Sequence, residues 1–129
     1  MKVLVCGGRR FNNQASVNAV LDALPVTTVI HGGARGADTC AANWAATHTT
    51  VGTESFPADW EKHGRSAGII RNAQMLKEGQ PDLVVAFTGG RGTADMVRRA
   101  KGAGVRVLGV EEPDTKQILD EVFAHVFKE

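Results

Sequence analysis

The sequence has no tyrosine, only two cysteines and few aromatic residues of any kind. Without a Cys/His cluster there is no metal-site spacing, so we predict no metal and no required cofactor. Cys6 and Cys40 stand in apolar stretches, which indicates small buried hydrophobes. No apolar run approaches the about 20 residues of a membrane span. Since Met1 leads directly into an apolar strand pattern without a signal peptide, we expect a cytoplasmic protein with no membrane partner.

A strong excess of one charge is also missing. The 129 residues carry 15 Lys+Arg and 14 Asp+Glu, for a net charge of +1. Six arginines nevertheless gather in glycine-rich or loop segments: Arg9, Arg10, Arg35, Arg65, Arg71 and Arg91. This distribution favours a compact anionic ligand over a long polyanion. Single-stranded DNA binding is the weaker alternative, because such sites need stacking aromatics and a basic excess.

Three apolar runs each end in a Gly-Gly turn that carries an arginine. The first glycine turn (residues 7–11) contains Gly7, Gly8, Arg9 and Arg10; the second (residues 31–38) contains Gly32, Gly33, Arg35 and Gly36; the third (residues 88–95) contains Gly89, Gly90, Arg91, Gly92 and Thr93. Glycines let a ligand approach the backbone, and the helix that follows offers unpaired N–H groups. Such turns suit a phosphate or diphosphate, although any single one can need glycine for shape alone.

Alternating strand and helix patterns predict an α/β fold: a Rossmann-like three-layer sandwich with a five-stranded, mainly parallel sheet, as a single domain over residues 1–129. A strand order of 3-2-1-4-5 would gather all three turns at one crevice, whereas a flavodoxin-like order would separate them slightly. The patterns further predict an edge strand over residues 51–56 and a loop over residues 57–66. Two helix faces are expected, namely Ile69, Ile70, Ala73 and Leu76, and, after Pro113, Ile118, Leu119, Val122, Phe123 and Val126.

Candidates for proton transfer are Asp38, Asp59 and Asp95, together with His31 and His63. Asp38 and Asp95 are expected in the first turn of a helix, where a carboxylate usually caps the helix or pairs with its dipole; ribose contacts are the alternative. Trp60 either stacks on a base or packs against the body of the protein. No Gly-Lys-Ser/Thr and no GxGxxG spacing follows a strand, so neither ATPase chemistry nor hydride transfer is indicated.

Four segments carry a family resemblance: VLVCGGRRF, VIHGGARGADTCAANWA, FPADWEKHGRSAGIIRNAQML and PDLVVAFTGGRGTADMVRRA. Together they resemble the YspA/YpsA-related branch of the SLOG superfamily, a group of small bacterial and phage proteins. The resemblance implies a Rossmann-like domain that binds a nucleotide or a nucleotide-derived ligand, such as an ADP-ribose-like signal. The superfamily includes cytokinin-activating phosphoribohydrolases, whose helix arginine is similar in place to Arg71, beside Asn72.

These phosphoribohydrolases carry the motif PGGxGTxxE. In this chain Thr88 stands at the proline and Met96 at the glutamate, which is expected to assist cleavage of the N-glycosidic bond. We therefore predict a nucleotide sensor or binding domain rather than an enzyme. The alternative is a nucleotide-processing hydrolase that uses Asp38, Asp59 or Asp95 on a glycosidic or phosphate bond. A homodimer is left open.

Overall fold

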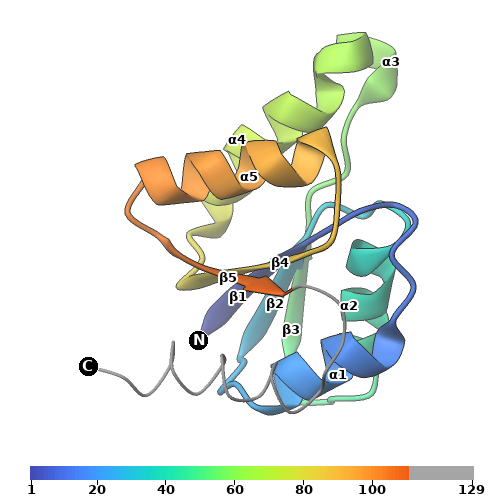
Figure 1. Ribbon diagram of the computed structural model, residues 1–129, viewed down its shortest axis with the longest axis vertical. Coiled ribbons are helices and arrows are strands. Elements are labelled where there is room, and N and C mark those ends of the chain that lie inside the picture. The colour runs from blue at the N-terminus through green and yellow to red at the C-terminus, as the bar shows by residue number, and fades with distance from the viewer. Residues whose placement is uncertain (111–129) are drawn as a thin grey trace.

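The computed structural model describes residues 1–110 (Figure 1). The expected helix after Pro113 lies outside the described residues. The described elements follow in the order β1 (Lys2–Cys6), α1 (Gln14–Asp22), β2 (Thr28–His31), α2 (Ala37–Ala46), β3 (Gly52–Ser55), α3 (Trp60–His63), a 3-10 turn (Gly64–Ser66), α4 (Ala67–Gly79), β4 (Leu83–Phe87), α5 (Arg91–Gly102) and β5 (Arg106–Val110). No helix in this part of the chain is long and apolar enough to cross a bilayer.

The five strands form one sheet in the order β3-β2-β1-β4-β5, which confirms the predicted order. Every ladder is parallel, including the two that flank β1, where Val3 pairs with Val29 on one side and with Leu83 on the other. The chain therefore reverses its direction of winding between β1 and β4. The carboxyl ends of these two strands lie side by side, and they are followed by the first and third glycine turns.

Two layers of helices cover the sheet, α1 and α2 on one face and α4 and α5 on the other (Figure 1). The alternation of side chains along β1 supplies both layers. Val3 and Val5 belong to the core under α1 and α2, whereas Leu4 and Cys6 belong to the core under α4 and α5. This period of two explains why the central strands read as unbroken apolar runs, since both of their faces are buried.

Helix α2 ends at Ala46, and His48 follows its last turn. The His48 Nδ1 lies 2.7 Å from the Trp44 carbonyl oxygen, and the two rings stack with centroids 3.9 Å apart. The Trp44 indole is 4% exposed and donates a hydrogen bond of 2.9 Å to Asp22. His48 therefore packs against the last turn of α2, and Trp44 is fixed inside the core.

The expected buried face of α4 is wrong at its start, although Leu76 does pack against the core under α4 and α5. Ile69 and Ile70 are 48% and 41% exposed, and the helix instead buries Ala67, Asn72 and Met75. The error has a physical cause, because the buried position nearest the glycine turns is taken by a polar side chain whose hydrogen bonds are satisfied within the fold. Because apolar periodicity does not count a polar residue as buried, it predicts the wrong side of the helix as the buried one.

The segment expected as a loop, residues 57–66, contains the short helix α3 and the 3-10 turn. Asp59 starts α3, since its side chain accepts a hydrogen bond of 3.1 Å from the Lys62 N–H. Figure 1 shows α3 beside one end of α4, remote from the sheet. A single helical turn is too short to leave a periodic signal, but it sets the position of Trp60.

Candidate functional site

The three glycine turns contact one another directly. The Gly8 N–H donates to the Thr88 carbonyl at 2.8 Å, and the Ala37 N–H reaches the Gly8 carbonyl at 3.4 Å. This closeness requires glycine. A Cβ on Gly8 would lie 3.0 Å from the Thr88 oxygen, and one on Gly36, whose φ is +86°, would collide with the Gly8 oxygen. The glycines are thus explained in part by the packing of turn against turn.

Helix α4 ties the second and third turns together through two successive residues. The Arg71 Nη1 donates to the Gly32 carbonyl at 2.7 Å, and the Asn72 Nδ2 donates to the Gly92 carbonyl at 3.0 Å. The Arg71 Nε also donates to the Asn72 Oδ1 at 3.1 Å, which orients both side chains. The turns are therefore held by side chains as well as by the ends of the strands.

Between these turns and helices α3, α4 and α5 lies a cleft of about 810 Å³. Its volume is within the range of small-molecule sites. The cleft is lined by Cys6, Gly7, Gly8, Arg9, Ala34, Asp38, Trp60, Arg65, Gly68, Ile69, Arg71, Asn72, Met75, Gly90, Arg91, Gly92, Thr93, Ala94, Asp95 and Arg98. Since five of these residues are arginines and two are aspartates, the lining attracts anions.

The structure brings most, but not all, of the sequence-predicted residues to this cleft. Those that line it are Gly7, Gly8, Arg9, Asp38, Arg71, Asn72, Gly90, Arg91, Gly92, Thr93 and Asp95. Those outside the lining are Arg10, Gly32, Gly33, Arg35, Gly36, Gly89 and Asp59. Arg10 and Arg35 are exposed. Gly32 and Gly36 instead hold the turns together: the Gly32 carbonyl accepts a hydrogen bond from Arg71, and Gly36 packs against Gly8.

The N-terminus of α5 opens into the cleft. Its N-cap residue, Gly90, supplies no side-chain hydrogen bond. The N–H groups of Arg91, Gly92 and Thr93 belong to the first helical turn, where no intrahelical acceptor exists. The positive end of the helix dipole lies at the same place. This end of α5 therefore has the properties of an anion site.

Asp38 lines the cleft and also holds the second glycine turn in place. Its Oδ2 accepts hydrogen bonds from the Gly32 N–H at 3.1 Å and the Ala34 N–H at 3.2 Å. Burial raises the pKa of Asp38, and the hydrogen bond from Ala34 and the charge of Arg71 offset part of this rise. The residue is in the first turn of α2, as expected, but it binds the amides of the preceding loop instead of capping its own helix.

Asp95 lies in the second turn of α5, which corrects the expectation of a first-turn residue. It is buried and accepts hydrogen bonds from Asn72 at 3.1 Å, Arg98 at 2.8 Å and Arg99 at 2.9 Å. Burial alone would raise the pKa of Asp95, but the hydrogen bonds from Asn72 and Arg99 and the neighbouring charges outweigh it and lower that pKa. An ionised, fully partnered carboxylate of this kind stabilises the helix and is poorly suited to carry protons.

The residue after Asp95 points away from the cleft. Met96 is fully buried in the core under α5, in the same cluster as Leu4 and Cys6. The position that corresponds to the glutamate of the phosphoribohydrolases thus faces the sheet, and α5 presents Asp95 to the cleft instead. Asp59 is exposed and outside the lining, so α3 contributes no carboxylate to it.

Burial keeps both His31 and Cys6 in their uncharged forms. The His31 Nδ1 accepts a hydrogen bond of 3.0 Å from the Gly33 N–H, and burial lowers the pKa of His31, so its ring is neutral. Burial raises the pKa of Cys6 to about 12, with the charge of Asp38 adding to the effect, so its thiol stays protonated. Within residues 1–110, no three His, Cys, Asp or Glu side chains lie together as a metal site would require.

Several lining residues were not among the predicted ones: Arg65, Gly68, Ile69 and Arg98. Arg98 follows Arg91 by seven residues, so its place on the same side of α5 was available from helical spacing. Trp60 was weighed as either packed or stacking, and the packed interpretation is wrong. Its side chain is 49% exposed and lines the cleft, with the Arg9 guanidinium 5.2 Å from the ring centroid.

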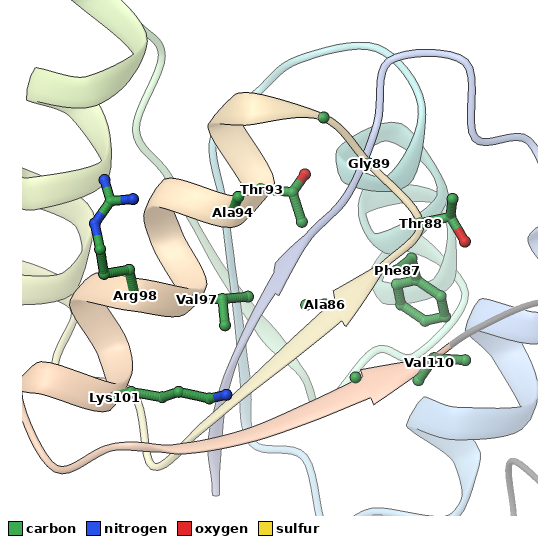
Figure 2. A pocket seen from close by; sticks show the side chains of 12 residues that line it. Ala86, Phe87, Thr88, Gly89, Thr93, Ala94, Val97, Arg98, Lys101 and Val110 are labelled. Atoms are coloured by element: carbon green, nitrogen blue, oxygen red, sulfur yellow. The ribbon is translucent and has the colours of Figure 1, made fainter.

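A second cavity of about 850 Å³, which was not predicted, lies on the other side of the third glycine turn. Figure 2 shows it between α5, which contributes Val97 and Lys101, and the strands that carry Phe87 and Val110. The two cavities have four lining residues in common: Gly90, Thr93, Ala94 and Arg98. The start of α5 therefore stands between two hollows.

Comparison with known proteins relates the chain to a sequence family and to a phage protein. The sequence model of the YspA, cpYpsA-related SLOG family matches residues 1–63. The Gene 61 protein of Mycobacterium phage D29 is 39% identical over 118 aligned residues, which cover 83% of this chain and 94% of that protein. The match to the family includes the first two glycine turns and Asp38. The chain belongs to the YspA, cpYpsA-related SLOG family.

Proposed function

We propose that the cleft binds a nucleotide or a nucleotide-derived phosphate ligand, for instance one related to ADP-ribose, and that the protein acts as a sensor or binding domain for it. The observation that carries this proposal is the meeting of the uncapped N-terminus of α5 with Arg9, Arg71 and Arg91 around one cleft. Membership of a SLOG family agrees with a nucleotide-related role.

The charges of the cleft are arranged for a small anion. Within residues 1–110, neither Arg9 nor Arg91 forms an ion pair with a carboxylate, so both guanidinium groups are available to a ligand. Arg71 is already held by the Gly32 carbonyl and beside Asp38, which fixes its position. A phosphate at the start of α5 would combine backbone N–H groups with forked, charge-assisted hydrogen bonds.

Thermal unfolding with a panel of ligands tests the proposal. Mononucleotides, dinucleotides, cyclic nucleotides and ADP-ribose are added at millimolar concentration. A ligand present at about 100 times its Kd stabilises the fold by about 2.7 kcal/mol, which is several degrees in Tm for a domain of this size. No shift with any member of the panel would contradict the proposal.

Calorimetry on two arginine variants locates the site. Arg91→Ala removes a guanidinium from the cleft, and a lost charge-assisted contact costs about 1.5–3 kcal/mol, or roughly 10- to 100-fold in Kd. Arg10→Ala is the matched control, because it removes the same charge from an exposed position outside the lining. Equal losses in the two variants would mean that the ligand senses only net charge.

Asp38 supports a second candidate function, hydrolysis of a nucleotide. Its pKa is raised, it lines the cleft, and its Oδ1 has no hydrogen-bond partner within residues 1–110. A carboxyl group with these properties can act as a general acid. Chromatography for free base released from AMP and GMP tests it. Multiple turnovers that Asp38→Asn abolishes would establish an enzyme, and their absence would leave a binding domain.

A further inference from the structure

The two tryptophans of the chain stand in opposite environments. Trp44 is 4% exposed, stacks on His48 and donates its indole N–H to Asp22. Trp60 is 49% exposed, and its Nε1 makes no hydrogen bond within residues 1–110. The core accounts for the first tryptophan. Nothing in the packing of the described residues requires an indole at the second.

Trp60 is positioned as one wall of the cleft. It begins α3, whose N-cap is fixed by the hydrogen bond between Asp59 and Lys62. The edge of its ring lies over Gly68 of α4, where an added Cβ would come within 3.7 Å of the indole. Ile69 continues the same wall and is also exposed. The result is an apolar surface that α3 and α4 contribute to the wall of the cleft.

The Arg9 guanidinium covers the Trp60 ring at 5.2 Å from its centroid. A planar ring inserted between two planar groups needs about 7 Å, which is twice the contact distance of carbon atoms. An aromatic ligand therefore cannot enter between them, and one that stacks on this face of the indole must take the place of Arg9. Arg9 belongs to the first glycine turn, so on leaving the indole it remains beside the anion site at α5.

We propose that Trp60 is the stacking platform for the base of a nucleotide, and that Arg9 is exchanged from the indole to the phosphate of the same ligand when it binds. This rests on the proposed function and narrows it, because the ligand must then carry a planar aromatic ring as well as a phosphate. Cation–π and stacking interactions use the same face of an indole, so one replaces the other.

Binding by the Trp60→Ala variant tests the platform. The probes are AMP and GMP, which carry a base, and ribose 5-phosphate, which does not. Loss of a stacking contact with a base costs about 5- to 150-fold in affinity. Trp60→Ala should weaken AMP or GMP by that factor, leave ribose 5-phosphate within about twofold, and be rescued largely by Trp60→Phe. Ile70→Ala is the control, since Ile70 is 41% exposed on α4 but outside the cleft lining.

Fluorescence gives a readout that a merely structural role would not produce. The nucleotide should quench the wild-type emission, whereas Trp60→Phe, in which Trp44 alone emits, should show no change. Arg9→Ala should weaken ribose 5-phosphate as well as the nucleotides. Equal weakening of all probes by Trp60→Ala, or an unchanged affinity for the nucleotides, would overturn the platform. If no probe binds the wild-type protein at all, the phosphate site itself is wrong.

Discussion

Asn72 offers a test of how the glycine turns are held. Its amide donates to the Gly92 carbonyl at 3.0 Å and to the Asp95 Oδ2 at 3.1 Å, and its own oxygen accepts from Arg71 at 3.1 Å. Asn72→Asp keeps the size of the side chain but replaces both donors with an acceptor. It also places a second carboxylate against Asp95, which is buried.

The cost can be worked from that distance. Two unit charges 3.1 Å apart repel by about 5 kcal/mol at an effective dielectric constant of about 20. The pair escapes this by binding a proton, which for a carboxyl of pKa about 3.9 costs about 4 kcal/mol at pH 7. Since protonation limits the cost and the nearby arginines offset part of the repulsion, we expect Asn72→Asp to lower the free energy of unfolding by about 3–4 kcal/mol at pH 7.

The loss should depend on pH with a definite sign. In the folded variant, repulsion between the new carboxyl group and Asp95 raises the pKa of the pair above the unfolded value. The electrostatic penalty on stability is therefore absent below about pH 4 and grows as the pH rises. Urea unfolding should therefore show that the difference in the free energy of unfolding between wild type and variant is about 2–3 kcal/mol smaller at pH 4.5 than at pH 7. Asn43→Asp, on the exposed side of α2, adds the same charge and should change little. A gap of equal size at both pH values would refute the contact with Asp95.

Three further outcomes follow from the described contacts. Gly36→Ala should destabilise the fold by more than about 1–3 kcal/mol in urea unfolding, because φ is +86° and the added Cβ meets the Gly8 oxygen. Gly102→Ala is the control: the space around Gly102 is open, and the change should raise the free energy of unfolding by about 0.5–1 kcal/mol. Native Cys6 should resist thiol reagents at pH 8 and react only after denaturation, because burial raises its pKa to about 12; rapid labelling without denaturant would contradict this. Asp95→Asn should destabilise the protein at pH 7 and progressively less in strong acid, because the folded-state pKa of Asp95 is lowered and the stability that its charge provides is lost as the pH falls through that pKa; an effect that does not diminish in acid would refute it.

The sheet was predictable because its sequence signals are strong and local. Each central strand is an apolar run that ends at glycines, and the order of the strands follows from where such turns can meet. Gly8 and Gly36 were singled out only as residues that a ligand could approach. Their contact with each other, through the Gly8 oxygen, depends on a distance between turns that a sequence does not contain.

The side of α4 that faces the turns was not predictable by the same means. Apolar periodicity favoured Ile69 and Ile70, which are exposed, over Asn72, which is buried. Asn72 can be buried because it forms hydrogen bonds with Gly92, Asp95 and Arg71. Arg71 precedes it in α4, but Gly92 and Asp95 belong to α5, which a sequence pattern in α4 does not reveal. The glycine turns predicted a crevice at the end of the sheet. The position of Trp60 beside it was not predictable, because Trp60 is placed by α3, a helix too short to leave a sequence signal.

The central claim is that a phosphate-bearing nucleotide binds at the start of α5 between the glycine turns. The most direct test is a titration of ¹⁵N-labelled protein with ADP-ribose, and separately with pyrophosphate, followed by amide chemical shifts. The account predicts that the amides of Gly7, Gly92 and Thr93 shift with both ligands, and that the indole N–H of Trp60 shifts with ADP-ribose alone. Shifts confined to Gly109 and Val110, which line the second cavity, or no saturable shift at all, would contradict it.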